Sequence, residues 1–300
     1  MKVIECRDVS KIYHQKQALS HLSFSIEENK ITGLIGRNGA GKTTILKIIA
    51  GFIHETEGET FVFGEKPFNN LHVSANRIFI DDQMIFPHSL TLKDILKTAA
   101  SFYHNWNNDL AKRLVTYYSF NLKQRHHHLS KGMKSTFNSI IGLAARCPLT
   151  IFDEPTTGMD SSVRKDFYRS LLKEYLNFPR TIILSSHLLN EIEDLLEDIL
   201  LIKDGENCLH VSLEELKEYA IALNGDEEKV REITSNREIL YEKKIGINQL
   251  YAVVRNDLSL REKEQTVFSN IELSAVPSDD VCSYLTNKSI GGIDDVFNRG

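Results

Sequence analysis

The chain has few cysteines, no long hydrophobic run and no excess of positive charge. Its four cysteines (Cys6, Cys147, Cys208 and Cys282) are far apart and form no CxxC pair, which excludes a disulfide or zinc framework and favours reduced thiols in the cytoplasm. No apolar stretch approaches the ~20 residues that a membrane-spanning helix needs. The net charge of −5 argues against a protein that binds nucleic acid through a strongly positive surface.

Repeats, low-complexity tracts and a targeting segment are also missing. The N-terminus carries a strand pattern from its first residues, so we expect no signal peptide. The absence of repeats excludes a solenoid. The remaining composition, 41% hydrophobic and 26% charged over 300 residues, is typical of a globular protein with one large domain or a large and a small one. If the protein works at a membrane, we expect another chain to hold it there.

Strands alternate with helices in the first two thirds of the chain, which predicts an α/β fold with a mainly parallel core sheet. The predicted core strands are Ile31–Ile35, Arg77–Ile80, Leu149–Phe152 and Thr181–Leu184. Alternating apolar residues at Val3–Arg7 and Leu22–Ile26 predict two antiparallel strands, and Thr60–Phe63 predicts another strand. We therefore expect an antiparallel β subdomain beside the core sheet.

Helical patterns predict a helical subdomain and a separate C-terminal part. The predicted helices are Leu92–Phe120, Lys134–Arg146 and Ser161–Leu176. The helical subdomain would occupy about residues 85–147. After about residue 205 the character changes, and a capping box at Ser212–Glu215 opens a short helix. Residues 216–300 are predicted to form a small α+β accessory domain without a chemical motif.

A glycine-rich loop joins a predicted buried strand to a predicted helix. Its residues are Gly36, Arg37, Asn38, Gly39, Ala40, Gly41, Lys42, Thr43 and Thr44. Strand, glycine-rich loop and helix, closed by Lys and Thr, form the context of a phosphate-binding P-loop, although a plain strand-to-helix turn also contains glycine. Lys42 would reach the β- and γ-phosphates of a nucleotide, and the Thr43 hydroxyl would bind Mg²⁺.

Two carboxylates follow the strand at Leu149–Phe152. Ligands bind at the carboxyl ends of strands in an open α/β sheet, so Asp153 is predicted to hold Mg²⁺ and Glu154 to orient or deprotonate the attacking water. A solvated acidic turn is the alternative interpretation. Ser130 and Gly132 lie just before a predicted helix, where serine is a good N-cap and glycine allows close backbone approach.

Together these motifs closely resemble the ATP-binding cassette, the ATPase subunit of ABC transporters. The resemblance covers about residues 1–215, the predicted nucleotide-binding domain. GRNGAGKTT matches the Walker A loop, LTIFDEP the Walker B strand, Thr157–Asp160 the D-loop and Ser185–His187 the switch histidine. LSKGM at 129–133 is similar to the signature LSGGQ, with Lys131 in place of glycine and Met133 in place of glutamine.

The resemblance implies an ATP site shared between two subunits. Two cassettes would dimerise head to tail around two ATP molecules, with Ser130, Lys131 and Gly132 of one subunit facing the γ-phosphate held by the other. His187 would contact this phosphate and act in catalysis with Lys42 and Glu154. Tyr13 falls where an aromatic residue stacks on adenine, and Asp160 would lie at the shared site.

The Q-loop is the weakest match to the family. Counting back from Phe86–Pro87 leads to Asp81, while the nearest glutamine is Gln83, so either residue is a candidate for contacting Mg²⁺ or water. Two short stretches are given less weight. His126–His128 is interpreted as a solvated turn, and Asp294–Phe297 resembles the ending of several exporter ATPases.

The resemblance implies an ATP- and Mg²⁺-dependent ATPase that drives a separate membrane-spanning subunit and pairs with itself or a paralogue. We expect it to lie peripherally on the inner face of the cell membrane. The chain is similar to Gram-positive cassettes that export antibiotics and antimicrobial or amphipathic peptides, including the staphylococcal phenol-soluble modulins. Two alternatives stay open: a soluble cassette acting on ribosomes or DNA, and a regulatory cassette that binds ATP with little turnover.

Overall fold

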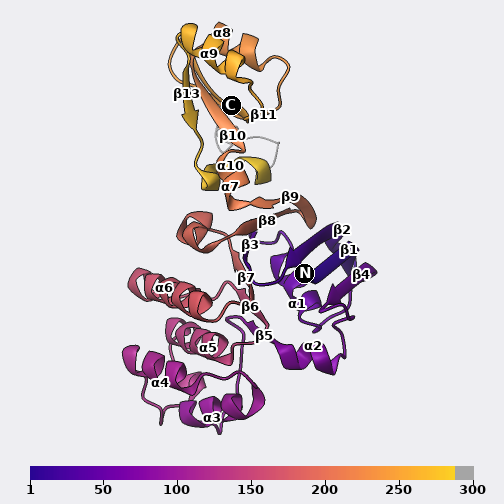
Figure 1. Cartoon of the computed structure of the whole chain (residues 1–300), viewed down its shortest axis with the longest axis vertical. Helices are drawn as coiled ribbons and strands as arrows, with labels where there is room; N and C mark the ends of the chain where they lie inside the picture. The colour runs from indigo at the N-terminus through magenta and orange to yellow at the C-terminus, as the bar shows by residue number, and fades with distance from the viewer. Residues whose placement is uncertain (288–300) are drawn as a thin grey trace, which may run out of the picture. The chain divides into compact units, whose positions relative to one another are not determined.

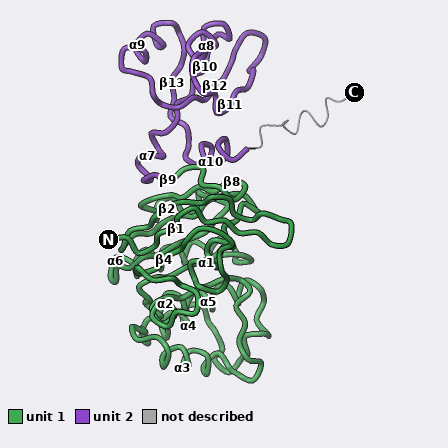
Figure 2. The backbone as a smooth tube through the Cα atoms, turned by 90° about the vertical axis from the view of Figure 1, so that its right-hand side faces the viewer, with its two compact units in different colours: residues 1–210 green, residues 211–300 purple. Residues whose placement is uncertain are grey.

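The computed structural model of the chain describes residues 1–287, so the stretch Asp294–Phe297 lies outside the described residues. The chain divides into two compact units, residues 1–210 and 211–300, which Figure 2 colours separately. Each unit has its own hydrophobic core. Among the described residues, no helix has the length and apolar character needed to cross a membrane.

The first unit is built on a mainly parallel sheet, as the sequence predicts. Within the described residues this sheet has six strands in the order β5-β6-β7-β3-β8-β9. The strands are β3 (Ile31–Ile35), β5 (Arg77–Ile80), β6 (Leu149–Asp153), β7 (Thr181–Ser186), β8 (Asp198–Lys203) and β9 (Glu206–Ser212). The pairs from β5 to β8 are parallel. β8 and β9 were not predicted; they are joined by Asp204–Gly205, both with positive φ, which is typical of a tight hairpin turn.

A second sheet of this unit is antiparallel and has the order β2-β1-β4. Its strands are β1 (Lys2–Tyr13), β2 (Lys16–Glu27) and β4 (Glu57–Val62). Helix α1 (Lys42–Ile49) lies between this sheet and the parallel one in Figure 1. Its apolar side chains join those of both sheets in one hydrophobic core. The core therefore fixes the start of α1, which closes the P-loop.

Helices pack around the parallel sheet (Figure 1). They are α2 (Leu71–Asn76), α3 (Leu92–Phe102), α4 (Asn108–Tyr117), α5 (Lys131–Ala145) and α6 (Ser161–Asn177). Of these, α3 to α5 lie within the stretch 85–147 for which helices were predicted. The single helix predicted over 92–120 is two helices, because the chain leaves helical conformation at Tyr103 and Asn107 caps α4. Helix α5 is buried from Ser135 to Ala145 and packs on β5 and β6.

The three consecutive histidines form a 3₁₀ turn, η1 (His126–His128), and the interpretation as a solvated turn is wrong for His126. His126 is only 5% exposed because its ring packs against Phe86 and Phe137. Two further 3₁₀ turns, η2 (Leu189–Glu191) and η3 (Glu193–Leu195), lead from β7 to β8.

The second unit contains a four-stranded antiparallel sheet in the order β11-β12-β10-β13, counted over the described residues. Its elements are α7 (Leu213–Lys217), β10 (Ala220–Asp226), α8 (Glu227–Thr234), β11 (Ile239–Lys244), β12 (Gln249–Arg255), α9 (Leu260–Phe268), β13 (Glu272–Ala275) and α10 (Ser278–Thr286). The β10-α8-β11-β12-α9-β13 succession with this strand order is the ferredoxin-like arrangement.

Candidate nucleotide site

Close packing shapes the loop between β3 and α1. Gly41 has a φ of 104°, and a side chain there would lie 2.7 Å from the carbonyl oxygen of Ala18. A side chain at Gly36 would lie 2.5 Å from the carbonyl oxygen of Ile202. Only glycine fits these two positions. The loop is thereby fixed so that α1 begins at Lys42, and a helix N-terminus favours phosphate.

Lys42 carries a charge at the start of α1 although it is only 5% exposed. Its Nζ donates to the carbonyl oxygen of Gly36 at 2.7 Å and lies 3.3 Å from Oε1 of Glu154. A buried ammonium needs such partners, because burying an unpaired charge is costly. The side chain therefore lies folded over the P-loop, next to the Walker B carboxylate.

The two carboxylates at the end of β6 have different surroundings. Asp153 is buried and its Oδ1 accepts a hydrogen bond from Ser185 Oγ at 2.6 Å. Ser185 Oγ in turn accepts from the backbone N–H of Glu154 at 2.9 Å. Glu154 is partly exposed and has a φ of 44°, a left-handed conformation that is uncommon outside glycine. The strained turn separates the two carboxylates and leaves Glu154 accessible.

The Glu154 side chain lies close to Lys42 and His187, which follow two other strands of the parallel sheet. Its Oε1 lies 3.3 Å from Lys42 Nζ, and its Oε2 lies 3.4 Å from Nδ1 of His187, whose side chain is 48% exposed. The three residues follow β6, β3 and β7, which are neighbours in the parallel sheet. Their meeting follows from the topology, since parallel strands end at the same edge.

A cavity of about 320 Å³ opens beside this edge. It is lined by Tyr13, Lys16, Ala18, Asn38, Gly39, Gly41, Lys42, Thr43, Thr44 and Glu154. The structure thus brings Tyr13 together with most of the P-loop and with Glu154. Lys16 and Ala18 were missed by the sequence analysis. They begin β2 next to Tyr13, so the short β1–β2 connection could have indicated them.

The oxygen donors near the cavity fit Mg²⁺, which prefers hydroxyl, carboxylate and phosphate oxygens. Thr43 lines the cavity, and Asp153 precedes Glu154 at its wall. In the described part of the chain, no three His, Cys, Asp or Glu side chains gather as a metal cluster. A Mg²⁺ ion here would take its other ligands from nucleotide phosphates and water.

The Q-loop candidates differ in position. Asp81 follows β5, one residue beyond the paired positions Ile80 and Phe152, so it lies beside Asp153. Burial raises the pKa of the Asp81 carboxyl, and the charge of Asp153 acts in the same direction. Gln83 is exposed and donates its backbone N–H to Asp81 Oδ1 at 3.1 Å. Asp81 is therefore the candidate nearer the Walker B carboxylate.

The signature residues do not line this cavity. Ser130 caps α5 by accepting from the backbone N–H of Met133 at 3.3 Å. A side chain at Gly132 would lie 2.2 Å from the carbonyl oxygen of Gly158, so the signature and the D-loop pack backbone to backbone. Asp160 caps α6 by accepting from two backbone N–H groups. Lys131 Nζ lies 3.1 Å from Asp82 Oδ2.

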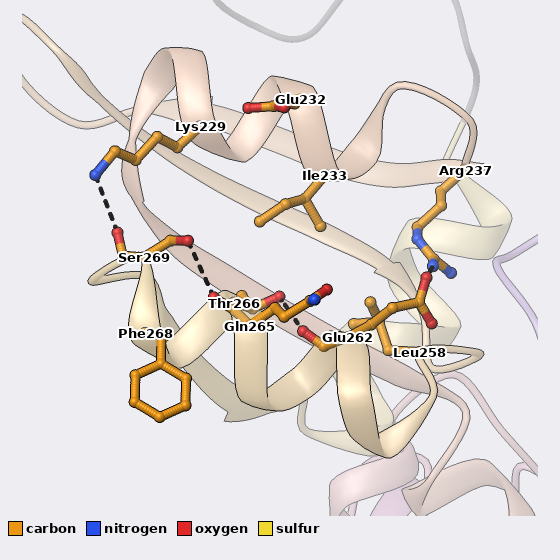
Figure 3. A pocket seen from close by; sticks show the side chains of 10 residues that line it. All are labelled: Lys229, Glu232, Ile233, Arg237, Leu258, Glu262, Gln265, Thr266, Phe268 and Ser269. Atoms are coloured by element: carbon orange, nitrogen blue, oxygen red, sulfur yellow. Dashed lines mark hydrogen bonds and ion pairs between the residues drawn. The ribbon is translucent and has the colours of Figure 1, made fainter.

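A cavity of about 690 Å³ lies in the second unit between α8 and α9 (Figure 3). Lys229 Nζ donates to the carbonyl oxygen of Ser269 at 3.2 Å, and Arg237 pairs with Glu262 at 2.6 Å. Each contact joins one helix to the residues that follow the other helix, across the cavity. Its lining contains none of the predicted ATP-site residues.

Comparison with known proteins gives the same family over the region of the motifs. The family described as ABC transporter matches residues 19–157. YtrB of Bacillus subtilis, an ABC transporter ATP-binding protein, is 31% identical over 74% of this chain and 76% of its own length. The bacitracin transport ATP-binding protein BcrA of Bacillus licheniformis is 30% identical over 72% of this chain and 71% of its own.

Two further proteins are similar to this chain. The SkfA peptide export ATP-binding protein SkfE of Bacillus subtilis is 28% identical over 73% of this chain and 93% of its own. The dimeric structure of the bacterial ABC transporter cassette MJ0796 has a TM-score of 0.61 at 21% identity, covering 70% of this chain and 98% of its own; it supports the fold. The family match and the relatives at 30% identity or above show that the chain belongs to the ABC transporter ATP-binding proteins and is an ABC transporter ATPase.

Proposed function

We propose that the chain hydrolyses ATP as the nucleotide-binding subunit of a bacterial exporter, and that its working form is a dimer attached to a separate membrane subunit. The observation that carries this proposal is the convergence of Lys42, Glu154 and His187 beside the P-loop cavity. A cassette that only binds nucleotide has no need for a base next to the phosphate site. The arrangement therefore favours turnover over a purely regulatory role.

In the proposed mechanism Lys42, Glu154 and His187 have different roles. When ATP binds, the Lys42 ammonium would leave Glu154 and pair with the phosphates, since a phosphate carries more negative charge than a carboxylate. Glu154 would then accept a proton from, or orient, the attacking water, and His187 would contact the γ-phosphate. Thr43 and Asp153 would hold Mg²⁺, which when bound neutralises charge on the phosphates.

The dimer is proposed because the cavity contains no residue of the signature. Ser130 and Lys131 are exposed, and Ser130 marks the N-terminus of the 15-residue helix α5. A helix N-terminus, a hydroxyl and an ammonium together suit a phosphate held by a second subunit. The dimeric form of the MJ0796 cassette supports this proposal.

The membrane subunit would dock on the helical region, where apolar side chains are exposed. Ile85 after β5 is 88% exposed and Phe102 at the end of α3 is 70% exposed. Such side chains favour an apolar partner surface over water. Through this contact the cassette would sit on the inner face of the membrane. The relatives BcrA and SkfE support an antibiotic or peptide as cargo, and amphipathic peptides such as the phenol-soluble modulins belong to that class.

The test of this proposal uses Glu154→Gln, which keeps the shape of the side chain and removes its basicity. We expect ATP binding close to the parental value, turnover reduced at least about 100-fold as for the loss of a general base, and an ATP-dependent dimer in sedimentation. Parental turnover in Glu154→Gln would show that another group activates the water. Copurification with ribosomes or DNA, without a membrane protein, would contradict the exporter assignment.

A further inference from the structure

A residue that departs from the family signature forms an ion pair at the start of α5. Lys131 stands where the family signature has glycine, and Asp82 lies in the loop that follows β5. Lys131 Nζ lies 3.1 Å from Asp82 Oδ2, with side-chain exposures of 61% and 35%. Within one subunit, the ammonium predicted to face a phosphate therefore already has a partner.

The loop that carries Asp82 is held in place by residues on both sides of the signature. Asn138 is fully buried in α5, and its Nδ2 donates to the carbonyl oxygen of Asp81 at 3.3 Å. Its Oδ1 accepts from His126 Nε2 at 2.8 Å. The His126 ring packs edge-on against Phe86, with 4.9 Å between the ring centroids. Asp82 lies between these anchored points, so its position near the signature is built into the fold.

We infer that Asp82 is a positioning residue that holds the Lys131 ammonium on the signature and competes for it with the phosphate of an ATP molecule bound by a second subunit. This inference rests on the proposed head-to-tail dimer. An exposed ion pair is weak, whereas a phosphate is more highly charged than a carboxylate, so the phosphate takes over the ammonium as the subunits close. The charge of Asp82 therefore determines the ATP concentration at which the two subunits associate.

The size of the effect follows from the number of ion pairs that open. Breaking one exposed pair changes an equilibrium by about 1.4- to 5-fold. A symmetric dimer contains two such pairs. Removing the charge of Asp82 should therefore raise the ATP-driven association constant by about 2- to 30-fold. Removing the charge of Lys131 should lower it, because the attraction to phosphate is lost.

The experiment measures ATP-dependent dimerisation of the full chain by sedimentation in the Glu154→Gln background. Asp82→Asn should associate more tightly and Lys131→Met less tightly than this parent. In the double variant Asp82→Asn should add nothing, because its effect acts through Lys131. Glu59→Gln is the matched control: it removes an exposed ion pair with Lys66 of similar length, 3.2 Å, and should leave association unchanged. The gain in Asp82→Asn should shrink at 0.5 M salt, where charges are screened.

The possible failures are distinguishable. If the Glu154→Gln parent forms no dimer with ATP, the proposed function is overturned and the inference with it. If the parent dimerises and Asp82→Asn leaves association unchanged or weakens it, Asp82 does not compete with phosphate and the inference alone is overturned. An equal effect of Asp82→Asn with and without Lys131→Met would likewise overturn it, since it would show that Asp82 acts by another route.

Discussion

The contact between Gly132 and the D-loop makes Gly132→Ala a sharp test of how the signature is positioned. The added β-carbon would lie 2.2 Å from the carbonyl oxygen of Gly158, roughly 1 Å short of an ordinary van der Waals contact. The atoms met are the backbone carbonyl oxygen and carbon of Gly158, which cannot swing aside as the end of a flexible side chain can. The D-loop and the start of α5 must therefore separate.

The cost can be worked out from the contacts involved. Overpacking of this kind costs about 1–3 kcal/mol. Separation also weakens the hydrogen bond from Ser135 Oγ to the carbonyl oxygen of Thr157, now 2.8 Å long and worth about 0.5–1.5 kcal/mol. Replacing glycine by alanine in a helix returns up to about 1 kcal/mol. The first unit should lose about 1–3 kcal/mol, which for its size lowers Tm by about 2–12 °C.

The assay combines thermal unfolding with ATP binding and turnover. ATP binding by Gly132→Ala should stay near parental, because Gly132 does not line the P-loop cavity. Turnover should fall about 100-fold, the effect of misplacing a catalytic element by ~1 Å. Met133→Ala is the control, since its side chain lies in the same helical turn and is 39% exposed. A Gly132→Ala protein with parental Tm and turnover would refute the argument from close packing.

Two further predictions concern polar groups behind the site. Ser185→Ala removes the hydroxyl that joins Asp153 to the Glu154 backbone, so it should cost about 1–3 kcal/mol in denaturant unfolding and reduce turnover; unchanged stability would contradict this. Burial lowers the pKa of His126, with Lys134 and His127 acting in the same direction. The unfolded chain therefore binds its proton more readily, and stability should fall as pH drops below about 6.5. The fall between pH 7.5 and 5.5 should be smaller in His126→Gln, and an equal fall would contradict the assignment.

The sequence predicted the parallel core and the phosphate loop because both depend on local pattern. Ile31–Ile35 and Leu149–Phe152 are short apolar runs that end in motif residues, so both the strands and their functional edge can be inferred. β8 is just as apolar, but it was missed, because no motif follows it. The ferredoxin-like order of the second unit depends on pairing β10 with β12 and β13, contacts between distant residues that no local pattern encodes.

The surroundings of individual side chains were harder to predict than the motifs. Three consecutive histidines indicate a polar turn, yet the burial of His126 is decided by Phe86, far away in the sequence. Lys131 was predicted to face a phosphate, and the structure adds its ion pair with Asp82. The roles of the site residues at a shared interface stay predictions, because each depends on a second subunit.

Mixed dimers test the shared ATP site most directly. Lys42→Ala and Ser130→Phe should each abolish turnover alone, one by removing the phosphate-binding ammonium and the other by blocking the N-terminus of α5. In a heterodimer of the two, one site contains both defects and the other contains none. A 1:1 mixture should therefore recover about a quarter of the parental ATPase rate, as expected for random pairing in a two-fold dimer. No recovery at any mixing ratio, with heterodimers shown to form, would contradict the shared site.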